Sequence, residues 1–528
     1  MNTAEFLTIS AAIVPDRIAV VGPDERISYA DLQTRVNKLA QALQARGVQR
    51  GQNVGVMAVN CPEFVEIYYA TAALGATLVP LNFRAKADEL EYMVESTDVS
   101  TLFISERYWS IWEGVSSQVG GVQNVVPLDF SRDGLVSYRD LRESGEDIPV
   151  WTEIEESDPT IIIFTSGTTS LPKGVVLSYQ ALTALVVNTQ SPADPTSDQE
   201  VVLVSVPFFH IAGATTMMSA VFSGRRLVIL PAFEPKAWLE AVEKEGVTHA
   251  FVVPTMLKRI QEAPEFASAD LSSLQLITYG AAPMPYEVVR KAVELFGPAG
   301  KDVGLMNSYG QTEATGSMTF LGPDDHRLDG TPEENEKKIA RLRSVGRTMP
   351  DVEVVTMAPD GRILGINEDG EICIRGDRVM KGYNKRDDDT SSAIHGGWLH
   401  TGDVGRIDED GYLYITGRIK DMVIRGGENI APAEIEQVLE GHPGVSEAAV
   451  IGVPDVEWGE VVMAVMIPSA NAPKPDDAEL TGYVKSRLAS YKAPAYYRWA
   501  DDFPRNHLGK VLKNDLRKEY AQPESQTA

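Results

Sequence analysis

The sequence contains few of the residues that build covalently or metal-stabilised folds. It has two cysteines among 528 residues, Cys61 and Cys373, and they lie far apart in unrelated contexts. This excludes a disulfide scaffold and a CxxC metal motif, and it favours a reducing compartment. The seven histidines are scattered along the chain, so a histidine metal cluster is not expected.

Long apolar runs and an excess of basic residues are also missing. No run approaches the roughly 20 residues of a membrane span, and the N-terminus MNTAEFLTISAAIVPDR has no signal-peptide pattern. The chain has 48 basic and 75 acidic residues, so its formal net charge is -27. This charge argues against nucleic acid or an anionic membrane as the main partner. We expect a cytoplasmic protein that binds small molecules, because a single loop can still gather donors for an anionic ligand.

What the chain does have is the composition of an ordinary globular protein, with 43% hydrophobic and 23% charged residues. Its length predicts roughly two to four compact units. Predicted strands and helices alternate over residues 28–104 and 160–313, which indicates α/β structure with βαβ units and a largely parallel sheet. Residues 109–156 look irregular and are interpreted as a connection between subdomains. Residues 352–415 predict a small β-rich subdomain, and residues from 432 onward predict a separate α+β module.

The most informative stretch is IIIFTSGTTSLPKG, from Ile161 to Gly174. A short apolar run predicts a buried strand, and small hydroxyl residues, two glycines and Lys173 follow it. Such a string suits a phosphate, because glycine lets backbone N–H groups approach, hydroxyls donate and lysine adds positive charge. It is not a Walker A loop, since no GK[ST] ends it. By composition alone, a flexible surface loop would fit equally well.

Seven further strings follow in order along the chain. They are PFFH (207–210), YGAAP (279–283), NSYGQTE (307–313), GEICIRG (370–376), GGWLHTGD (396–403), YITGRIKDMVIRGGENI (414–430) and PRNHLGK (504–510). The first four of the eight strings lie at predicted strand ends, where open α/β sheets bind ligands, so one shared site is expected. Together the eight strings resemble the adenylate-forming superfamily of acyl-CoA synthetases, adenylation domains and beetle luciferases. The resemblance covers nearly the whole chain and is most similar to fatty-acid and aromatic-acid CoA ligases.

The resemblance implies a two-step reaction. A carboxylate, either fatty or aromatic or alicyclic, attacks the α-phosphate of ATP and gives an acyl-adenylate and pyrophosphate. The thiol of coenzyme A then takes the acyl group and AMP is released. The first step joins two anions, so it needs charge neutralisation and alignment. ATP, Mg²⁺ and coenzyme A are the implied small-molecule partners.

The resemblance also implies a nucleotide site. The loop would hold the β- and γ-phosphates, Tyr309 would stack on adenine, Asp403 would accept both ribose hydroxyls and Arg418 would contact ribose or phosphate. The full implied ATP/AMP set is Thr165, Ser166, Gly167, Thr168, Thr169, Lys173, Gly280, Ala281, Ala282, Ser308, Tyr309, Gly310, Gln311, Thr312, Asp403, Arg418 and Lys510. Taken singly, each of these is an ordinary turn, core or surface residue.

Four residues are implied in catalysis. Thr312 would donate to the α-phosphate, and Glu313 would hold Mg²⁺, for which a hard carboxylate oxygen is a suitable ligand. Lys510 would reach the α-phosphate and the acyl oxygen. His210 is expected as a wall between the acyl pocket and the thiol tunnel, not as a general base; by pattern alone it would be a core histidine.

The remaining implied positions concern the acid, coenzyme A and domain motion. The acyl pocket is expected at Phe209, His210, Gly213, Thr278 and Tyr279, with the nearby segment 314–318. Gly426 and Gly427 would line the thiol tunnel, with Trp458 and Lys492 nearer the nucleotide end of coenzyme A. Lys420 matches the family's hinge. The expected division is an N-terminal domain over 1–417, a hinge at 418–420 and a mobile C-terminal domain over 421–528.

Alternatives of other classes stay open. The enzyme could load a carrier-protein phosphopantetheine thiol in place of coenzyme A. A nucleotide-binding regulator without catalysis is a second alternative, against which intact Lys173, Glu313 and Lys510 argue. Luciferase-like oxygenation is a more distant third. The sequence leaves the acid, its chain length and a homodimeric assembly undecided.

Overall fold

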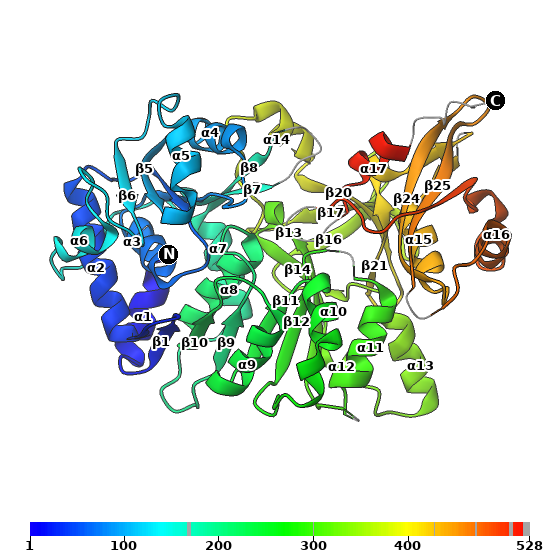
Figure 1. Cartoon of the computed structure of the whole chain (residues 1–528), viewed down its shortest axis with the longest axis horizontal. Coiled ribbons are helices and arrows are strands. Elements are labelled where there is room, and N and C mark those ends of the chain that lie inside the picture. Colours follow the sequence, from blue (N-terminus) through cyan, green and yellow to red (C-terminus); the bar gives the residue numbers. More distant parts are fainter. Residues whose placement is uncertain are drawn as a thin grey trace.

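The computed structural model describes residues 1–165, 171–282, 284–298, 300–426, 428–469, 472–505 and 511–520. Their strands form four sheets (Figure 1). Two large sheets with their helices make up the N-terminal part of the chain, and a small five-stranded sheet follows them. The last sheet, with the helices that follow residue 430, lies at the other end of the molecule. The predicted α/β fold is confirmed.

The nine-stranded sheet is parallel through its centre and antiparallel at its edges. Its order is β15 (Arg347–Thr348), β14 (Gly316–Leu321), β13 (Gly304–Gln311), β12 (Leu276–Gly280), β11 (His249–Val252), β9 (Val201–Val204), β10 (Arg226–Ile229), β1 (Ile18–Val21) and β2 (Arg26–Ser28). The sequence VVLV of β9 is buried at every position. Such a continuous apolar run is what a central parallel strand needs, because helices cover both of its faces.

The seven-stranded sheet carries the phosphate-type loop at one side. Its order is β18 (Gly382–Tyr383), β8 (Lys173–Ser178), β7 (Pro159–Thr165), β4 (Thr77–Pro80), β3 (Asn53–Met57), β5 (Val99–Ile104) and β6 (Asn124–Pro127). The strand expected before the loop is β7, but the loop leads into a second strand, β8, antiparallel to β7. The loop therefore joins the two strands of a hairpin, and Lys173 is the first residue of β8.

Residues 109–156 are more ordered than expected. They contain α5 (Trp109–Val115), α6 (Tyr138–Glu143) and β6, which pairs in parallel with β5. The interpretation of this region as an irregular connection is therefore wrong. The error arose because β6 is only four residues long and follows a polar, glycine-containing stretch, so no period is visible in the sequence.

Helices cover the two large sheets. They are α1 (Glu5–Ile13), α2 (Tyr29–Ala45), α3 (Pro62–Ala73), α4 (Ala87–Ser96), α7 (Tyr179–Thr189), α8 (Ile211–Phe222), α9 (Pro235–Glu245), α10 (Pro254–Glu262), α11 (Tyr286–Phe296), α12 (Pro323–His326) and α13 (Pro332–Arg341). Helix α2 is capped at its N-terminus, because Ser28 Oγ accepts from the Asp31 backbone N–H at 3.0 Å. Within the described part of the chain, no helix is both long and apolar enough to cross a membrane.

Two small sheets follow. The first contains β16 (Glu353–Met357), β17 (Gly370–Arg375), β20 (Trp398–Ile407), β19 (Ile394–His395) and β21 (Leu413–Arg418), and α14 (Asp387–Ala393) lies beside it. This confirms the predicted β-rich region. The second contains β23 (Glu428–Ile430), β22 (Val423–Arg425), β25 (Gly459–Pro468), β24 (Val445–Asp455) and β26 (Tyr496–Trp499), with α15 (Pro432–Glu440), α16 (Asp477–Lys485) and α17 (Lys513–Tyr520). Two apolar clusters formed by residues after 422 stabilise this last module.

Candidate active site

Three of the implied nucleotide residues meet at one carboxylate. Asp403 on β20 and Arg418 on β21 are register partners, and Arg418 Nε donates to Asp403 Oδ1. Tyr309 reaches the other oxygen from β13, with its hydroxyl 2.8 Å from Asp403 Oδ2. Burial, and next the charge of Asp403, raise the pKa of Tyr309 well above its usual value. Since an ionised carboxylate has about four lone-pair sites, Asp403 can accept two further hydroxyl donors.

A second set of contacts joins the phosphate-type loop to Glu313. The Tyr383 hydroxyl donates to Glu313 Oε1 at 2.9 Å, and Lys173 Nζ lies 4.9 Å from the centre of the Tyr383 ring. Lys173 Nζ also forms an ion pair of 2.5 Å with Asp389 Oδ1. The hydrogen bond from Lys173 is the main reason why the pKa of Asp389 lies below its usual value. Tyr383 thus touches both the lysine and the glutamate that were implied at the phosphates.

Tyr383 and Asp389 were not among the residues found from the sequence. Tyr383 lies on β18, which pairs with β8 so that Tyr383 is opposite Val175, two residues from Lys173. Asp389 lies in the first turn of α14, which follows β18 directly. The Gly382-Tyr383 pair comes soon after the GEICIRG string, but the sequence carries no signal that this segment returns to the other sheet.

Close backbone contacts form the next part of the site. A Cβ at Gly280 would lie 2.1 Å from the Ser308 carbonyl oxygen, and one at Gly310 would lie 1.8 Å from the Gly316 carbonyl oxygen. Ala281 has a φ of 68°, a left-handed conformation that is uncommon for a residue with a side chain. The string 307–311 was expected at a strand end but belongs to β13 itself. The short helical turn Thr312–Ala314 follows it and places Thr312 and Glu313.

One polar atom of this region lacks a partner in the described part of the chain. Gln311 Nε2 is buried and makes no hydrogen bond to the residues that the structure describes. Ser308 Oγ, in contrast, is satisfied by Ser317 Oγ at 2.6 Å. A buried amide donor without a partner costs free energy, so it fits a site that receives a ligand with acceptor atoms.

The residues implied for the acyl pocket do not all lie together. His210 is the N-cap of α8, and its ring centre is 4.2 Å from that of Phe209. Gly213 packs α8 against the Pro207 turn, because a Cβ there would lie 2.2 Å from the Pro207 carbonyl oxygen. Tyr279 is buried in the core, and its hydroxyl lies 2.7 Å from His326 Nε2. The Tyr279 side chain is therefore part of the core, whereas Thr278 is partly exposed on the opposite face of β12.

The residues implied for coenzyme A lie on the C-terminal module. Gly426 has a φ of 58°, and a Cβ there would lie 2.7 Å from the Trp458 ring. The Arg425 guanidinium stacks on Trp458 at 4.7 Å and donates to the Tyr491 carbonyl oxygen. Lys492, the next residue, forms an ion pair with Glu434. Gly426, Trp458 and Lys492 are thus brought into one region.

Several implied residues lie outside the described residues. They are Ser166, Gly167, Thr168, Thr169, Gly427 and Lys510. Of the loop, Thr165 ends β7, and its hydroxyl lies 3.4 Å from the Lys173 carbonyl oxygen. Lys420, implied as the hinge, lies in the turn Ile419–Asp421, where burial and next the charge of Arg418 lower its pKa.

Comparison with known proteins agrees with this geometry. Residues 7–384 match the AMP-binding enzyme family, and residues 434–510 match the AMP-binding enzyme C-terminal domain. The chain belongs to the AMP-binding enzyme family. The predicted resemblance to adenylate-forming enzymes and their acid–CoA ligases is confirmed, and the chain is an AMP-forming enzyme of this class.

Three relatives illustrate the range of this AMP-binding enzyme family. A feruloyl-CoA synthase from Amycolatopsis sp is 35% identical over 511 residues, which cover 97% of this chain and 97% of that protein. A long-chain-fatty-acid–CoA ligase from Mycobacterium tuberculosis is 33% identical over 523 residues, covering 98% and 99%. The structure of o-succinylbenzoate CoA synthetase from Bacillus subtilis in complex with its acyl-adenylate intermediate has a TM-score of 0.80, with 29% identity and 97% of each chain covered.

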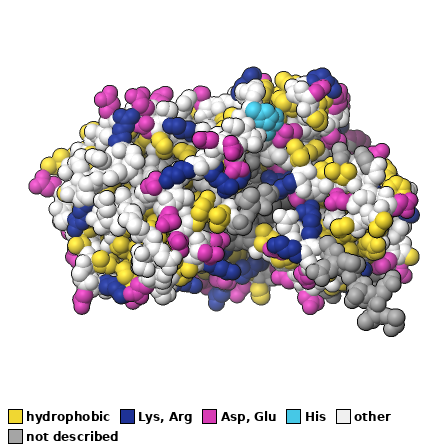
Figure 2. Space-filling model, turned by 90° about the horizontal axis from the view of Figure 1, so that it is seen from above, with side chains coloured by type: hydrophobic (Ala, Val, Ile, Leu, Met, Phe, Trp, Pro, Cys, Tyr) yellow, Lys and Arg dark blue, Asp and Glu magenta, His cyan; other side chains and the backbone are white. Residues whose placement is uncertain are grey.

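The electrostatics of this AMP-binding enzyme suit an anionic nucleotide locally. Lys and Arg side chains gather near the middle of one face (Figure 2), although the formal net charge is -27. Glu313 offers carboxylate oxygens, the ligand type that Mg²⁺ prefers. The residues present therefore fit a magnesium–nucleotide complex.

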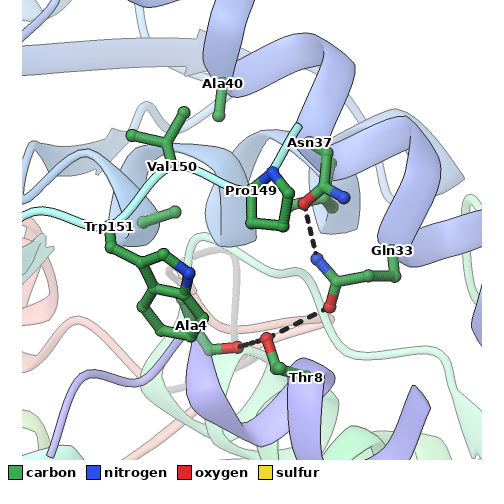
Figure 3. Close-up of a pocket in the computed structure, with 10 residues that line it drawn as sticks. Ala4, Thr8, Gln33, Asn37, Ala40, Pro149, Val150 and Trp151 are labelled. Atoms are coloured by element: carbon green, nitrogen blue, oxygen red, sulfur yellow. Dashed lines mark hydrogen bonds between the residues drawn. The ribbon is translucent and has the colours of Figure 1, made fainter. Parts of the chain in front are cut away.

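A separate cavity of about 20 Å³ lies between α1, α2 and residues 149–151. Figure 3 shows Gln33 hydrogen-bonded to Thr8 at 3.1 Å and to Asn37 at 2.8 Å beside it. A cavity of this size holds about one water molecule, so it is not the acid site.

Proposed function

We propose that this AMP-binding enzyme activates a fatty or aromatic carboxylic acid with ATP and transfers the acyl group from the adenylate to coenzyme A. The observation that supports this best is the meeting of Tyr309, Asp403 and Arg418 at one carboxylate. They come from three strands of two different sheets, and a plain packed turn would not need such an arrangement. Asp403 can accept ribose hydroxyls there, while the Arg418 guanidinium donates to its Oδ1.

Residues of this chain then act on the phosphates. Lys173 neutralises the β- and γ-phosphates, and Thr312 donates to the α-phosphate as the carboxylate attacks. Lys510 stabilises the charge that develops between the acid and the α-phosphate. Glu313 would hold Mg²⁺, which when bound supplies further neutralisation of phosphate charge. Lys173 must leave Asp389 to reach a phosphate, so ATP binding exchanges one ion pair for another.

The thioester step is assigned to the C-terminal module. Gly426, Trp458 and Lys492 lie in one region and would receive coenzyme A. We propose a hinge at 418–420, where β21 ends at Arg418 and the turn Ile419–Asp421 leads on to the last sheet. Rotation at this hinge would exchange Lys510 for the Gly426 face between the two steps.

The acid class rests on the relatives and on the aromatic residues at the start of α8. The printed names of the relatives include a feruloyl-CoA synthase and a long-chain-fatty-acid–CoA ligase. Phe209 packs edge-on against Phe83, with ring centres 5.1 Å apart, which provides an apolar surface next to His210. Such a surface suits a flat ring or an alkyl chain better than an amino acid.

The test is a panel of carboxylic acids incubated with ATP, Mg²⁺ and coenzyme A, scored by AMP release and by thioester mass. We expect aryl or fatty acids to give both products. The variant Lys510→Ala tests the adenylation step by itself. Its ATP–pyrophosphate exchange should fall at least ~100-fold, while thioester formation from supplied acyl-adenylate persists. Adenylate formation without any thioester would favour a carrier-protein thiol. Absence of both with every acid would overturn the proposal.

A further inference from the structure

Scattered residues of metal-binding type meet on one sheet face, although the sequence has no metal motif. Glu371 and Cys373 are two positions apart on β17, so their side chains point to the same face. His400 on β20 is the register partner of Cys373 in the antiparallel pair. Directly opposite residues have Cβ atoms about 5 Å apart, which brings the third side chain to the same place.

The three side chains converge tightly. His400 Nδ1 lies 2.8 Å from Glu371 Oε2 and 3.4 Å from Cys373 Sγ. One ligand atom from each residue lies within 4.8 Å of the other two. A tetrahedral zinc ion with bonds of about 2.0–2.3 Å needs ligand atoms about 3.3–3.7 Å apart. Shifts of about 1 Å or less in the side chains would reach that spacing.

We propose that Glu371, Cys373 and His400 form a binding site for a zinc-type divalent transition metal. Thiolate, imidazole and carboxylate together are zinc ligands, and the sulfur disfavours Mg²⁺ and Ca²⁺. The fourth position is left to water. This site is distinct from the Mg²⁺ position assigned to Glu313, which would use oxygen ligands and phosphate.

The surroundings hold the ligands in place. The second Glu371 oxygen accepts from the Gly402 backbone N–H at 3.0 Å, which orients the carboxylate without occupying Oε2. The His395 ring stacks parallel on His400 at 3.6 Å and fixes its plane. Such outer contacts tune metal affinity by about 10- to 100-fold in known sites.

The burial of the three side chains also suits a metal site that an ion can enter from one side. Cys373 is fully buried against Met357 and Trp398, which keeps the sulfur away from bulk water. The Glu371 and His400 side chains are 22% and 13% exposed, so an ion can enter from their side. A metal would displace the thiol proton of Cys373 on binding.

The test uses the full chain, stripped with a chelator and titrated with Co²⁺ as a spectroscopic substitute for zinc. We expect one equivalent to bind with a thiolate-to-cobalt charge-transfer absorption, which Zn²⁺ then removes by displacement. Cys373→Ser should abolish the band, and His400→Gln should weaken binding at least ~10-fold. Cys61→Ser is the matched control, because Cys61 is the other cysteine, and it should keep the band.

A second measurement needs no variant. Alkylation of the native chain, read by peptide mass spectrometry, should modify Cys373 more slowly with one equivalent of Zn²⁺ than without metal, while Cys61 stays unchanged. A cobalt band that survives in Cys373→Ser, or equal alkylation of Cys373 with and without Zn²⁺, would overturn the proposal. In that case the contacts are an ordinary histidine–glutamate hydrogen bond beside a packed thiol.

Discussion

Tyr383 connects two groups that lie in different sequence motifs. Its hydroxyl donates to Glu313, and its ring face lies under Lys173. The hydroxyl contact holds the carboxylate that we assign to Mg²⁺, and the ring contact limits where the ammonium can go. Tyr383 is therefore a positioning residue for the phosphate end of the site.

Replacement of Tyr383 by Phe keeps the ring under Lys173 and removes only the hydrogen bond to Glu313. A hydrogen bond to a charged group contributes about 1.5–3 kcal/mol, so we expect ATP–pyrophosphate exchange to fall about 10-fold or more. The matched control is Tyr412→Phe, which removes a comparable hydrogen bond of 2.9 Å to Asp325 at another place. Equal activity of both variants would show that Tyr383 has no part in the reaction.

Asp389 holds Lys173 in an ion pair that ATP must replace. Asp389→Asn removes this competing charge, so we expect the KM for ATP to fall about 2- to 5-fold with little change in kcat, in line with the small free energy of partly exposed pairs. Asp388→Asn on the same helix is the control. The Asp388 side chain is exposed, and its replacement removes the same negative charge from the chain. An increase in KM for Asp389→Asn would mean that Asp389 delivers Lys173 to ATP.

Strand β13 carries the nucleotide string, and its packing leaves no room at Gly310. A Cβ there would lie 1.8 Å from the Gly316 carbonyl oxygen on β14. We expect Gly310→Ala to destabilise the chain by about 2–3 kcal/mol, because backbone cannot move aside as a flexible side chain can. Thermal unfolding measures this. Gly322→Ala, where a Cβ meets nothing within 4 Å, should unfold at nearly the wild-type temperature.

Elements with a strong local signal were predicted well. The alternation of strands and helices predicted over residues 28–104 and 160–313 is present, and the apolar run before the loop located β7. Which strands pair with one another could not be predicted from such local signals. The antiparallel return of β8 against β7 is a local hairpin that the loop string did not predict. The pairing of β18 with β8 joins residues about 200 positions apart in the chain and leaves no periodic trace. For this reason Lys173 was found from the sequence, but its partners Tyr383 and Asp389 were not.

Local sequence signals were equally limited for the acyl pocket and for the proposed metal site. The resemblance implied Tyr279 at the acyl pocket, and alternation along β12 turns its side chain into the core toward His326. Cys373 and His400 were dismissed as scattered, because only the register of β17 and β20 brings them together. Local sequence predicts which residues face one way along a strand, while register decides which residues meet.

The C-terminal module touches the large part of the molecule through charged groups. Lys258 on α10 lies 3.5 Å from Glu447 on β24, and Glu447 also pairs with Arg505. Glu436 beside them pairs with Lys513 at 2.6 Å and accepts from the Val450 backbone N–H. This cluster borders Glu440, the last residue of α15, which accepts from the Ala448 backbone N–H at 3.2 Å.

Burial, with the charges of Glu436 and Glu447 next, raises the pKa of Glu440 from 4.5 to about 8; the Ala448 hydrogen bond and Lys258 oppose the shift. Between these pH values the folded chain keeps a proton that the unfolded chain has released. The stability that neutral Glu440 contributes is therefore complete below about pH 4.5 and is lost as the pH rises to about 8.

Replacement of Glu440 by Gln makes this group neutral at every pH and keeps an acceptor for the Ala448 N–H. We expect the melting temperatures of variant and wild type to lie close together near pH 5, and the variant to melt several degrees higher at pH 8.5, because each unit by which the folded pKa is raised corresponds to about 1.4 kcal/mol. Differential scanning fluorimetry at both pH values measures this. Glu457→Gln, an exposed position, is the control for the change in net charge. The same offset at both pH values would show that Glu440 does not hold a proton in the folded chain.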